Sequence, residues 1–151
     1  FSGDRFSRTQ GTNAKMSEYQ AAVALASLDC WHKTRSIFSD ITKHYQDRIA
    51  SKATLSILPS PEDNHVTSSI MLESKTPLPQ GFDERLLENG IETRRWWGKG
   101  LHAQILNRKI QSTSLTQTKQ LAESCIGLPC FPGITTSEID YVVDNILREL
   151  R

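Results

Sequence analysis

The first half of the chain carries apolar residues at a helical period. Ser17 and Gln20 have the spacing of a capping box, in which side chains and backbone N–H groups at a helix start satisfy each other. Small and apolar residues then recur at helical spacing, at Ala21, Ala22, Ala24, Leu25, Leu28 and Trp31. A further apolar stripe follows, at Ile37, Phe38, Ile41, Tyr45 and Ile49. The pattern predicts a helix that begins at Ser17 and continues or restarts through residue 49.

From Thr54 the apolar period changes to that of strands. The stretch "TLSILPSPEDNHVTSSIMLES" predicts a short strand, a turn region rich in Pro and acidic residues, and a second strand near 65–74. An antiparallel pair is the simplest arrangement for them. Asp83 is then predicted to cap a short helix that ends with Gly90 just beyond it, and "IETRRWW" (91–97) predicts another strand.

The C-terminal third alternates between the two periods. A helix is expected around 115–126 and ending at Gly127, followed by a brief strand in "LPCFPG" (128–133). Thr135 and Glu138 form a second capping box, which opens a helix with one apolar face. Helices and strands in this order predict an α+β fold, a small and mostly antiparallel sheet with helices packed on one side.

Composition narrows the class of protein. The chain has 151 residues, 37% of them hydrophobic and 23% charged, which describes one globular domain with a core of its own. A net charge of +1 gives no excess of cations for nucleic acid, and no apolar run approaches the ~20 residues of a membrane span. We therefore expect neither partner, and an odd number of cysteines without CxxC spacing favours a cytoplasmic protein with reduced thiols. The chain begins without an initiator Met, and we expect a fragment or a processed piece.

Chemistry-bearing residues form few recognisable motifs. The three cysteines lack CxxC spacing and the four histidines lack HExxH spacing, so we expect reduced thiols and no metal site. No phosphate-binding glycine loop or GxSxG nucleophile motif is present. Cys125 and Cys130 are interpreted as small core residues. From its residue type alone, Asn13 is a turn residue before a helix.

The stretch "RRWWGKGLH" (94–102) leaves two interpretations open. Side chains alternate along a strand, so Trp96 and Trp97 are expected on opposite faces. One interpretation makes them core and interface residues. The other makes the stretch a ligand-facing loop, with His102 as a hydrogen-bonding group at its far end.

Three segments together resemble one enzyme family. "GTNAKMSEYQAAVALASL", "NGIETRRWWGKGLHAQ" and "LAESCIGLPCFPGITTSEIDYVVDNIL" are similar, in order and approximate spacing, to segments of the DegT/DnrJ/EryC1/StrS aminotransferases. These are pyridoxal-phosphate-dependent enzymes that act on nucleotide-linked keto sugars. The resemblance runs from Gly11 to Leu150 but covers only the later part of such an enzyme. It implies the C-terminal small domain of the type I aminotransferase fold over residues 17–151, preceded by a loop of the active-site and dimer region over residues 1–16.

The resemblance also implies an activity that this chain cannot perform alone. The full enzyme would move an amino group from an amino acid, with glutamate as the expected donor, onto a nucleotide-linked keto-deoxy sugar, for surface polysaccharide, lipopolysaccharide or deoxyamino-sugar biosynthesis. It would act as a homodimer. No lysine here has the family's Ser-x-x-Lys setting, so the amine that binds pyridoxal phosphate covalently is expected outside this chain, and no catalytic residue is assigned. The alternative is a non-catalytic α+β binding or dimerisation module that has lost the cofactor domain.

The family motifs carry over to three positions. Asn13 resembles the asparagine that bonds the cofactor phosphate of the other subunit, and Trp97 and His102 resemble residues near the sugar-nucleotide substrate. Two positions depart from the pattern. Lys15 stands where Arg is usual, which weakens a bidentate contact there. Gly100 stands where Pro commonly precedes the Leu-His pair, and we expect a looser loop.

Overall fold

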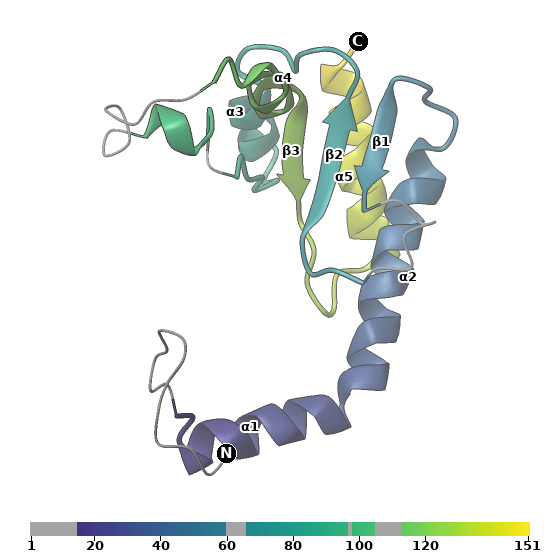
Figure 1. Ribbon diagram of the computed structural model, residues 1–151. Coiled ribbons are helices and arrows are strands. Elements are labelled where there is room, and N and C mark those ends of the chain that lie inside the picture. The colour runs from purple at the N-terminus through teal and green to yellow at the C-terminus, as the bar shows by residue number, and fades with distance from the viewer. Residues whose placement is uncertain (1–14, 60–65, 97, 105–112) are drawn as a thin grey trace. The chain divides into compact units, whose positions relative to one another are not determined.

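The computed structural model describes residues 15–59, 66–96, 98–104 and 113–151. The chain divides into two compact units, of which one ends at His32 and the other runs from Lys33 to Arg151. Helix α1 (Glu18–Asp29) belongs to the first unit and helix α2 (Trp31–Ile49) begins at its end. The strands and the remaining helices of the described residues belong to the second unit, and Figure 1 labels the strands and α-helices along the chain.

Helix α1 begins as the sequence predicts. The Ser17 hydroxyl accepts from the backbone N–H of Gln20 at 3.2 Å, and the Gln20 side chain accepts from the backbone N–H of Ser17 at 3.1 Å. The capping box is therefore complete. No residue of α1 is buried.

Helix α2 supplies the first apolar stripe of the core. Ile41, Tyr45 and Ile49 are spaced four residues apart, lie on one face and are buried. The hydroxyl of Tyr45 donates to the carbonyl of Pro129 at 2.9 Å, which satisfies its one buried polar atom and ties α2 to the segment after the sheet. The apolar stripe predicted between residues 37 and 49 is therefore confirmed.

The sheet has three antiparallel strands in the order β1-β2-β3. These are β1 (Leu55–Leu58), β2 (Ile70–Ser74) and β3 (Cys125–Leu128). Leu55 pairs with Ser74 between the first two strands, and Ile70 pairs with Leu128 between the last two. Burial alternates along β2, so one face of the sheet is covered and the other carries Met71 and Glu73. The predicted antiparallel pair is confirmed.

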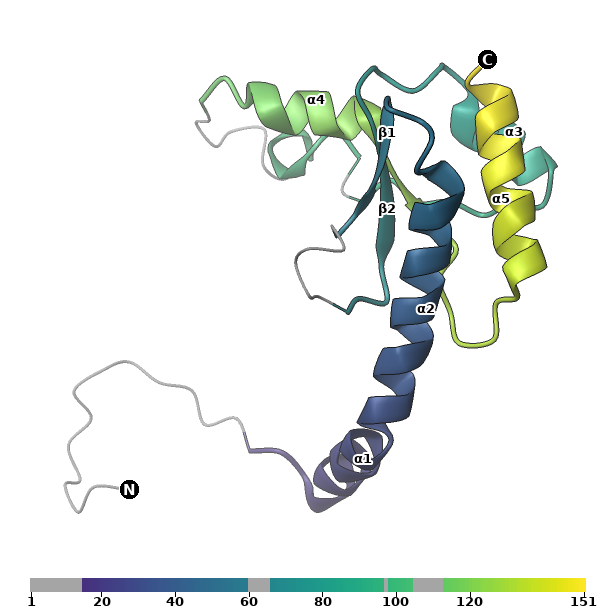
Figure 2. The ribbon, with the colours of Figure 1, turned by 90° about the vertical axis from the view of Figure 1, so that its right-hand side faces the viewer.

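Helices α2, α3 (Phe82–Glu88) and α5 (Thr136–Glu149) lie on one side of the sheet, and α4 (Thr116–Ser124) lies on the other (Figure 2). Thr135 and Glu138 cap α5 through the predicted reciprocal bonds. The core between helices and sheet consists of apolar side chains, among them Ile57, Leu72, Phe82, Leu86, Ile126, Ile139, Val143 and Ile146. The predicted α+β class is confirmed. Within the described part of the chain, no helix combines the length and the apolar content that a membrane crossing requires.

Two predicted strands are misplaced. Residues 125–128 form β3 rather than the end of a helix, and α4 ends at Ser124. Gly127 therefore lies within a strand, where the Arg94 carbonyl and the Trp96 indole approach so closely that a Cβ would stand 3.1 Å from each. The described part of the 91–97 segment forms no strand, because only Arg94 pairs, in an isolated bridge with Gly127.

The predicted helix cap at Asp83 is also wrong. Helix α3 has Gly81 as its N-cap, with a left-handed φ of 72°, and no side-chain cap bond. Asp83 lies one residue inside the helix, and its carboxylate pairs with Arg95 instead. The predicted end of the helix is confirmed, since Asn89 is the C-cap and Gly90 follows with a φ of 73°.

Candidate functional site

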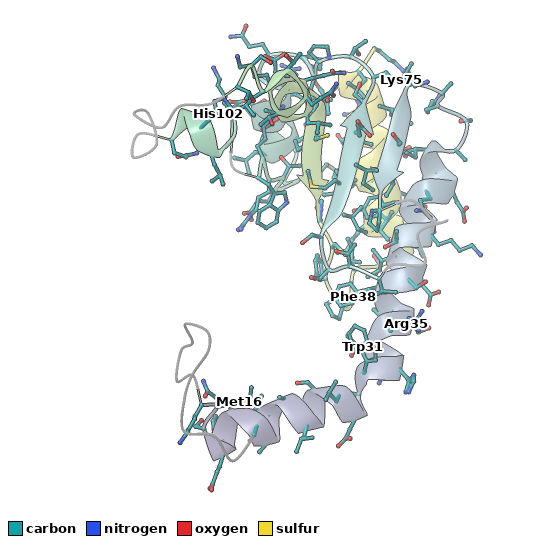
Figure 3. The ribbon with its side chains drawn as sticks, in the orientation of Figure 1. Met16, Trp31, Arg35, Phe38, Lys75 and His102 are labelled. Atoms are coloured by element: carbon teal, nitrogen blue, oxygen red, sulfur yellow. The ribbon has the colours of Figure 1, made fainter. Side chains whose placement is uncertain are left out.

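The three residues assigned from the family motifs differ in what the structure describes. Asn13 and Trp97 lie outside the described residues. His102 lies in the 3-10 helix η2 (Leu101–Ala103), which Figure 3 shows at a distance from the sheet. The site can therefore be described from the side of His102 alone.

The turn before His102 depends on glycine. Gly100 has a φ of 103°, which an L side chain rarely adopts and which proline cannot reach. A Cβ at this position would stand 2.8 Å from Cγ2 of Thr118 on α4 and 2.9 Å from Nδ1 of His102. The imidazole therefore folds back over Gly100, close to α4. Gly100 is buried, and the expectation of a looser loop stays a prediction.

Arg95 holds the base of this turn. Its Nε and Nη2 donate to the two carboxylate oxygens of Asp83 at 2.7 and 2.8 Å, and its Nη1 donates to the carbonyl of Ala122 at 3.1 Å. The bonds to Asp83 raise the pKa of the Arg95 guanidinium, because they favour its charged form. Arg95 thus ties the start of α3 to the end of α4, seven residues before His102.

A mostly apolar cavity of about 570 Å³ lies between the open face of the sheet, α4 and the His102 turn. Leu58, Met71 and Cys125 line it from the strands. His102 and Arg95 supply polar groups at its wall, and His102 also borders a second cavity of about 770 Å³ beside the start of α3. Apolar walls with a few polar groups are typical of small-molecule sites.

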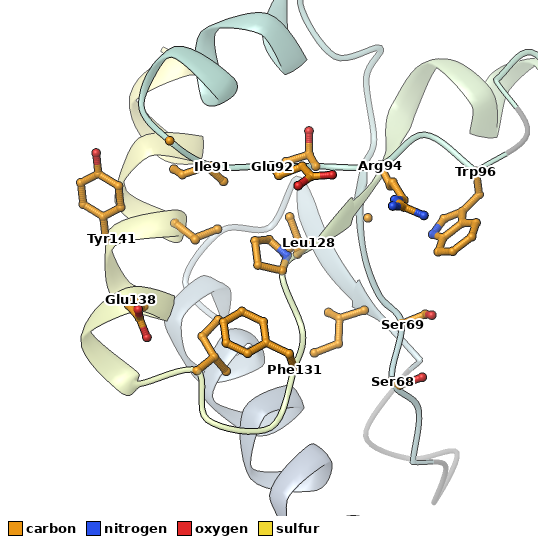
Figure 4. Close-up of a pocket in the computed structure, with 17 residues that line it drawn as sticks. Ser68, Ser69, Ile91, Glu92, Arg94, Trp96, Leu128, Phe131, Glu138 and Tyr141 are labelled. Carbon is orange, nitrogen blue, oxygen red and sulfur yellow. The ribbon is translucent and has the colours of Figure 1, made fainter.

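A third cavity of about 550 Å³ opens at the other end of β3 (Figure 4). Arg94, Trp96, Phe131 and Tyr141 line it, and Ser68 and Ser69 add hydroxyl groups. Cζ of Arg94 lies 5.8 Å from the centroid of the Trp96 ring, within reach of a cation–π contact. Trp96 lines both this cavity and the one beside His102. It is half exposed and therefore not a core residue, which leaves an interface position and a ligand-facing loop both open.

The described residues hold no group suited to bind a metal or to form a covalent bond to a carbonyl cofactor. No cluster of three or more metal-ligating side chains occurs among them. Every lysine among them is exposed, whereas an amine becomes a nucleophile at neutral pH when burial or a neighbouring cation lowers its pKa. The described part of the chain therefore does not fit covalent attachment of pyridoxal phosphate.

The cysteines differ in burial, and Cys130 packs against the hydrophobic core. All three are thiols, and Cys125 and Cys130 are partly buried. Burial raises the pKa of Cys130 to about 11 and raises the pKa of Cys125. Both therefore remain protonated and unreactive near neutral pH.

Several residues of these cavities were not predicted. The ion pair of Arg95 and Asp83 joins positions that no helix or strand period relates. Arg94 and Trp96 are two residues apart, and their alternation was a usable signal for a shared side. The third cavity is also lined by Ser69, Phe131 and Tyr141. These residues come from separate segments, and no local sequence pattern predicts that they lie close together.

Solved structures of aminotransferases share this fold. An aminotransferase from Brucella abortus superposes with a TM-score of 0.73 at 20% identity, covering 94% of this chain and 39% of its own. DesV from S. venezuelae superposes with a TM-score of 0.79 at 19% identity, covering 99% of this chain and 41% of its own. DesI, solved in the presence of its TDP-sugar product, superposes with a TM-score of 0.75 at 26% identity, and the match covers 93% of this chain and 38% of DesI. The chain thus spans about two fifths of the length of these relatives.

The family follows from the sequence match. Residues 2–147 match the DegT/DnrJ/EryC1/StrS aminotransferase family, and the chain belongs to that family. The match includes the three segments on which the resemblance was based, and it agrees with the fold of the solved relatives. A comparison with curated protein sequences gave no match.

Proposed function

We propose that this chain is the C-terminal part of a pyridoxal-phosphate-dependent aminotransferase that acts on a nucleotide-linked keto-deoxy sugar. Residues 17–151 would form its small domain, and residues 1–16 a loop of the active-site and dimer region. The family match over residues 2–147 carries the proposal. The likeness to DesI supports a nucleotide sugar as the substrate, because that relative was solved with a TDP-sugar product.

The cofactor would be bound mainly by a part of the enzyme other than this chain. Pyridoxal phosphate supplies the electron sink that lets an amino group leave one carbon and join another. The exposure of the described lysines supports an attachment amine elsewhere, and so supports an inactive chain when alone. Asn13 is proposed to donate its amide N–H to the cofactor phosphate of the other subunit, in a homodimer.

The substrate side is proposed to include His102 and Trp97. The cavity beside His102 supports this assignment, because apolar walls with an imidazole and a guanidinium at the side suit a sugar ring joined to a negatively charged nucleotide. Glutamate is the proposed amino donor. The product would enter surface polysaccharide, lipopolysaccharide or deoxyamino-sugar biosynthesis, in the cytoplasm.

The coding sequence upstream of Phe1 tests the proposal most cheaply. An open frame with a Ser-x-x-Lys segment is expected, and a polypeptide made from that frame should retain pyridoxal phosphate after gel filtration. Asn13→Ala should weaken cofactor retention without unfolding the protein. A stop codon or unrelated upstream sequence would support the alternative, a binding or dimerisation module without the cofactor domain.

A further inference from the structure

Most of the twelve residues of helix α1 are apolar, and none of its side chains is buried. Its large apolar side chains, Tyr19, Val23, Leu25 and Leu28, are 51% to 79% exposed. An exposed apolar surface of this kind marks an interaction site.

The apolar residues of α1 form two faces. Tyr19, Ala22, Val23 and Ala26 follow the spacing i, i+3, i+4, i+7, and so do Ala21, Ala24, Leu25 and Leu28. The second set is offset from the first by two residues, which is about 200° around a helix of 3.6 residues per turn. The two faces are therefore nearly opposite. Polar residues separate them, with Gln20 and Ser27 on one side and Glu18 and Asp29 on the other.

Each face combines large residues with alanines. Small side chains let a second backbone approach closely, and the large ones fill the space beside them. A helix with one such face lies on a surface, whereas a helix with two opposite faces fits between two surfaces.

We infer that α1 is an insertion helix, with both faces buried by the portion of the aminotransferase polypeptide that the solved relatives possess beyond the matched two fifths. This inference rests on the proposed function. The relatives cover 93% to 99% of this chain, while the chain covers only 38% to 41% of theirs. About three fifths of each relative is thus available as the covering body.

A second copy of this chain fits the pattern less well. In a two-fold contact the same patch meets itself, so pairing of two α1 helices covers one face and leaves the other in water. The two faces differ in composition, since the large residues of the first are a tyrosine and a valine and those of the second are two leucines. Two different covering surfaces on one larger body explain both features.

Substitutions on the two faces test this inference in the polypeptide extended by its upstream coding segment. Val23→Glu charges the first face and Leu25→Glu the second, and glutamate keeps a high helix propensity. Gln20→Glu is the matched control, because it adds the same charge on a polar strip and still completes the capping box. Each face variant should lower the melting temperature of the extended polypeptide, and the control should leave it unchanged.

Hydrogen exchange of residues 18–29 gives the direct readout. Exchange in the extended polypeptide should be ~100-fold or more slower than in the 151-residue chain, because burial protects helical amides. Equal exchange rates, or face variants that behave like the control, would overturn the inference. A third result would also overturn the inference: the 151-residue chain forms a dimer that Val23→Glu dissociates, while the same substitution has no effect on the extended polypeptide.

The outcome for α1 is separable from the outcome for the proposed function. Cofactor retention by the extended polypeptide reports on the function. A protein that retains pyridoxal phosphate while α1 exchanges freely refutes the insertion helix alone. A protein that protects α1 but binds no cofactor refutes the proposed function alone.

Discussion

Removing the ion pair between Arg95 and Asp83 should loosen the turn that carries His102. The pair joins the start of α3 to the segment that leads into the turn, and Arg95 also donates to the carbonyl of Ala122. Asp83→Ala leaves a partly buried guanidinium without its carboxylate. Arg95→Met keeps most of the side-chain volume but removes all three bonds. The double variant completes a thermodynamic cycle.

The geometry sets the size of the effect. Two parallel charge-assisted bonds of 2.7 and 2.8 Å link the side chains, which are 27% and 34% exposed. Hydrogen bonds to charged groups contribute about 1.5–3 kcal/mol when well buried, and exposed ion pairs about 0.2–1 kcal/mol. Partial exposure places this pair between the two, so we expect a coupling free energy of about 1–2 kcal/mol.

Urea unfolding of the four proteins, followed by tryptophan fluorescence, measures this coupling. The losses of the two single variants should add up to more than the loss of the double variant, because each single variant leaves one charged partner unpaired. Glu84→Ala is the control, since Glu84 is the exposed neighbour of Asp83, and it should change stability by less than about 0.5 kcal/mol. Additive effects within about 0.3 kcal/mol would refute the proposed link between α3 and the turn.

Three further predictions concern single residues. Gly100→Ala should destabilise the protein by about 2 kcal/mol in the urea assay, because the residue has a φ of 103° and its Cβ would contact α4. Gly98→Ala is the control and should cost about 1 kcal/mol, because a Cβ at Gly98 meets open space. Cys130 should react with iodoacetamide far more slowly than the exposed Cys30, because a pKa of about 11 lowers the thiolate fraction of Cys130 at pH 8 roughly 100-fold from that of an ordinary thiol. Mass spectrometry of labelled peptides measures both rates, and equal rates would contradict this prediction. Thr135→Ala should remove about 1 kcal/mol of stability through loss of the α5 capping box, and an unchanged unfolding midpoint would contradict this.

Local chemistry made much of the fold predictable. The two capping boxes depend on residues three positions apart, and both form where the sequence places them. The stripe of Ile41, Tyr45 and Ile49 likewise identifies α2, because one helical face has one environment. These features need no information from distant parts of the chain.

Features set by distant contacts were not predictable. Gly127 is typical of a helix end, yet it pairs with Met71 within β3, where Arg94 and Trp96 approach its backbone. Asp83 is a good helix cap by residue type, but a bidentate bond to Arg95 occupies its carboxylate. For the candidate site, the family motifs identified His102, and only the structure showed that Gly100 turns its imidazole back toward α4.

Amino transfer by the extended polypeptide tests the central claim most directly. The protein, loaded with pyridoxal phosphate, is mixed with glutamate and then with a TDP-linked 4-keto-6-deoxy sugar, and the cofactor spectrum and the sugar are followed. The proposed function predicts conversion of the cofactor to its amine form by glutamate, its return on addition of the sugar, and an amino sugar in the product. A polypeptide that binds no pyridoxal phosphate, or one whose amine-form cofactor stays unchanged with every nucleotide-linked keto sugar offered, would contradict it.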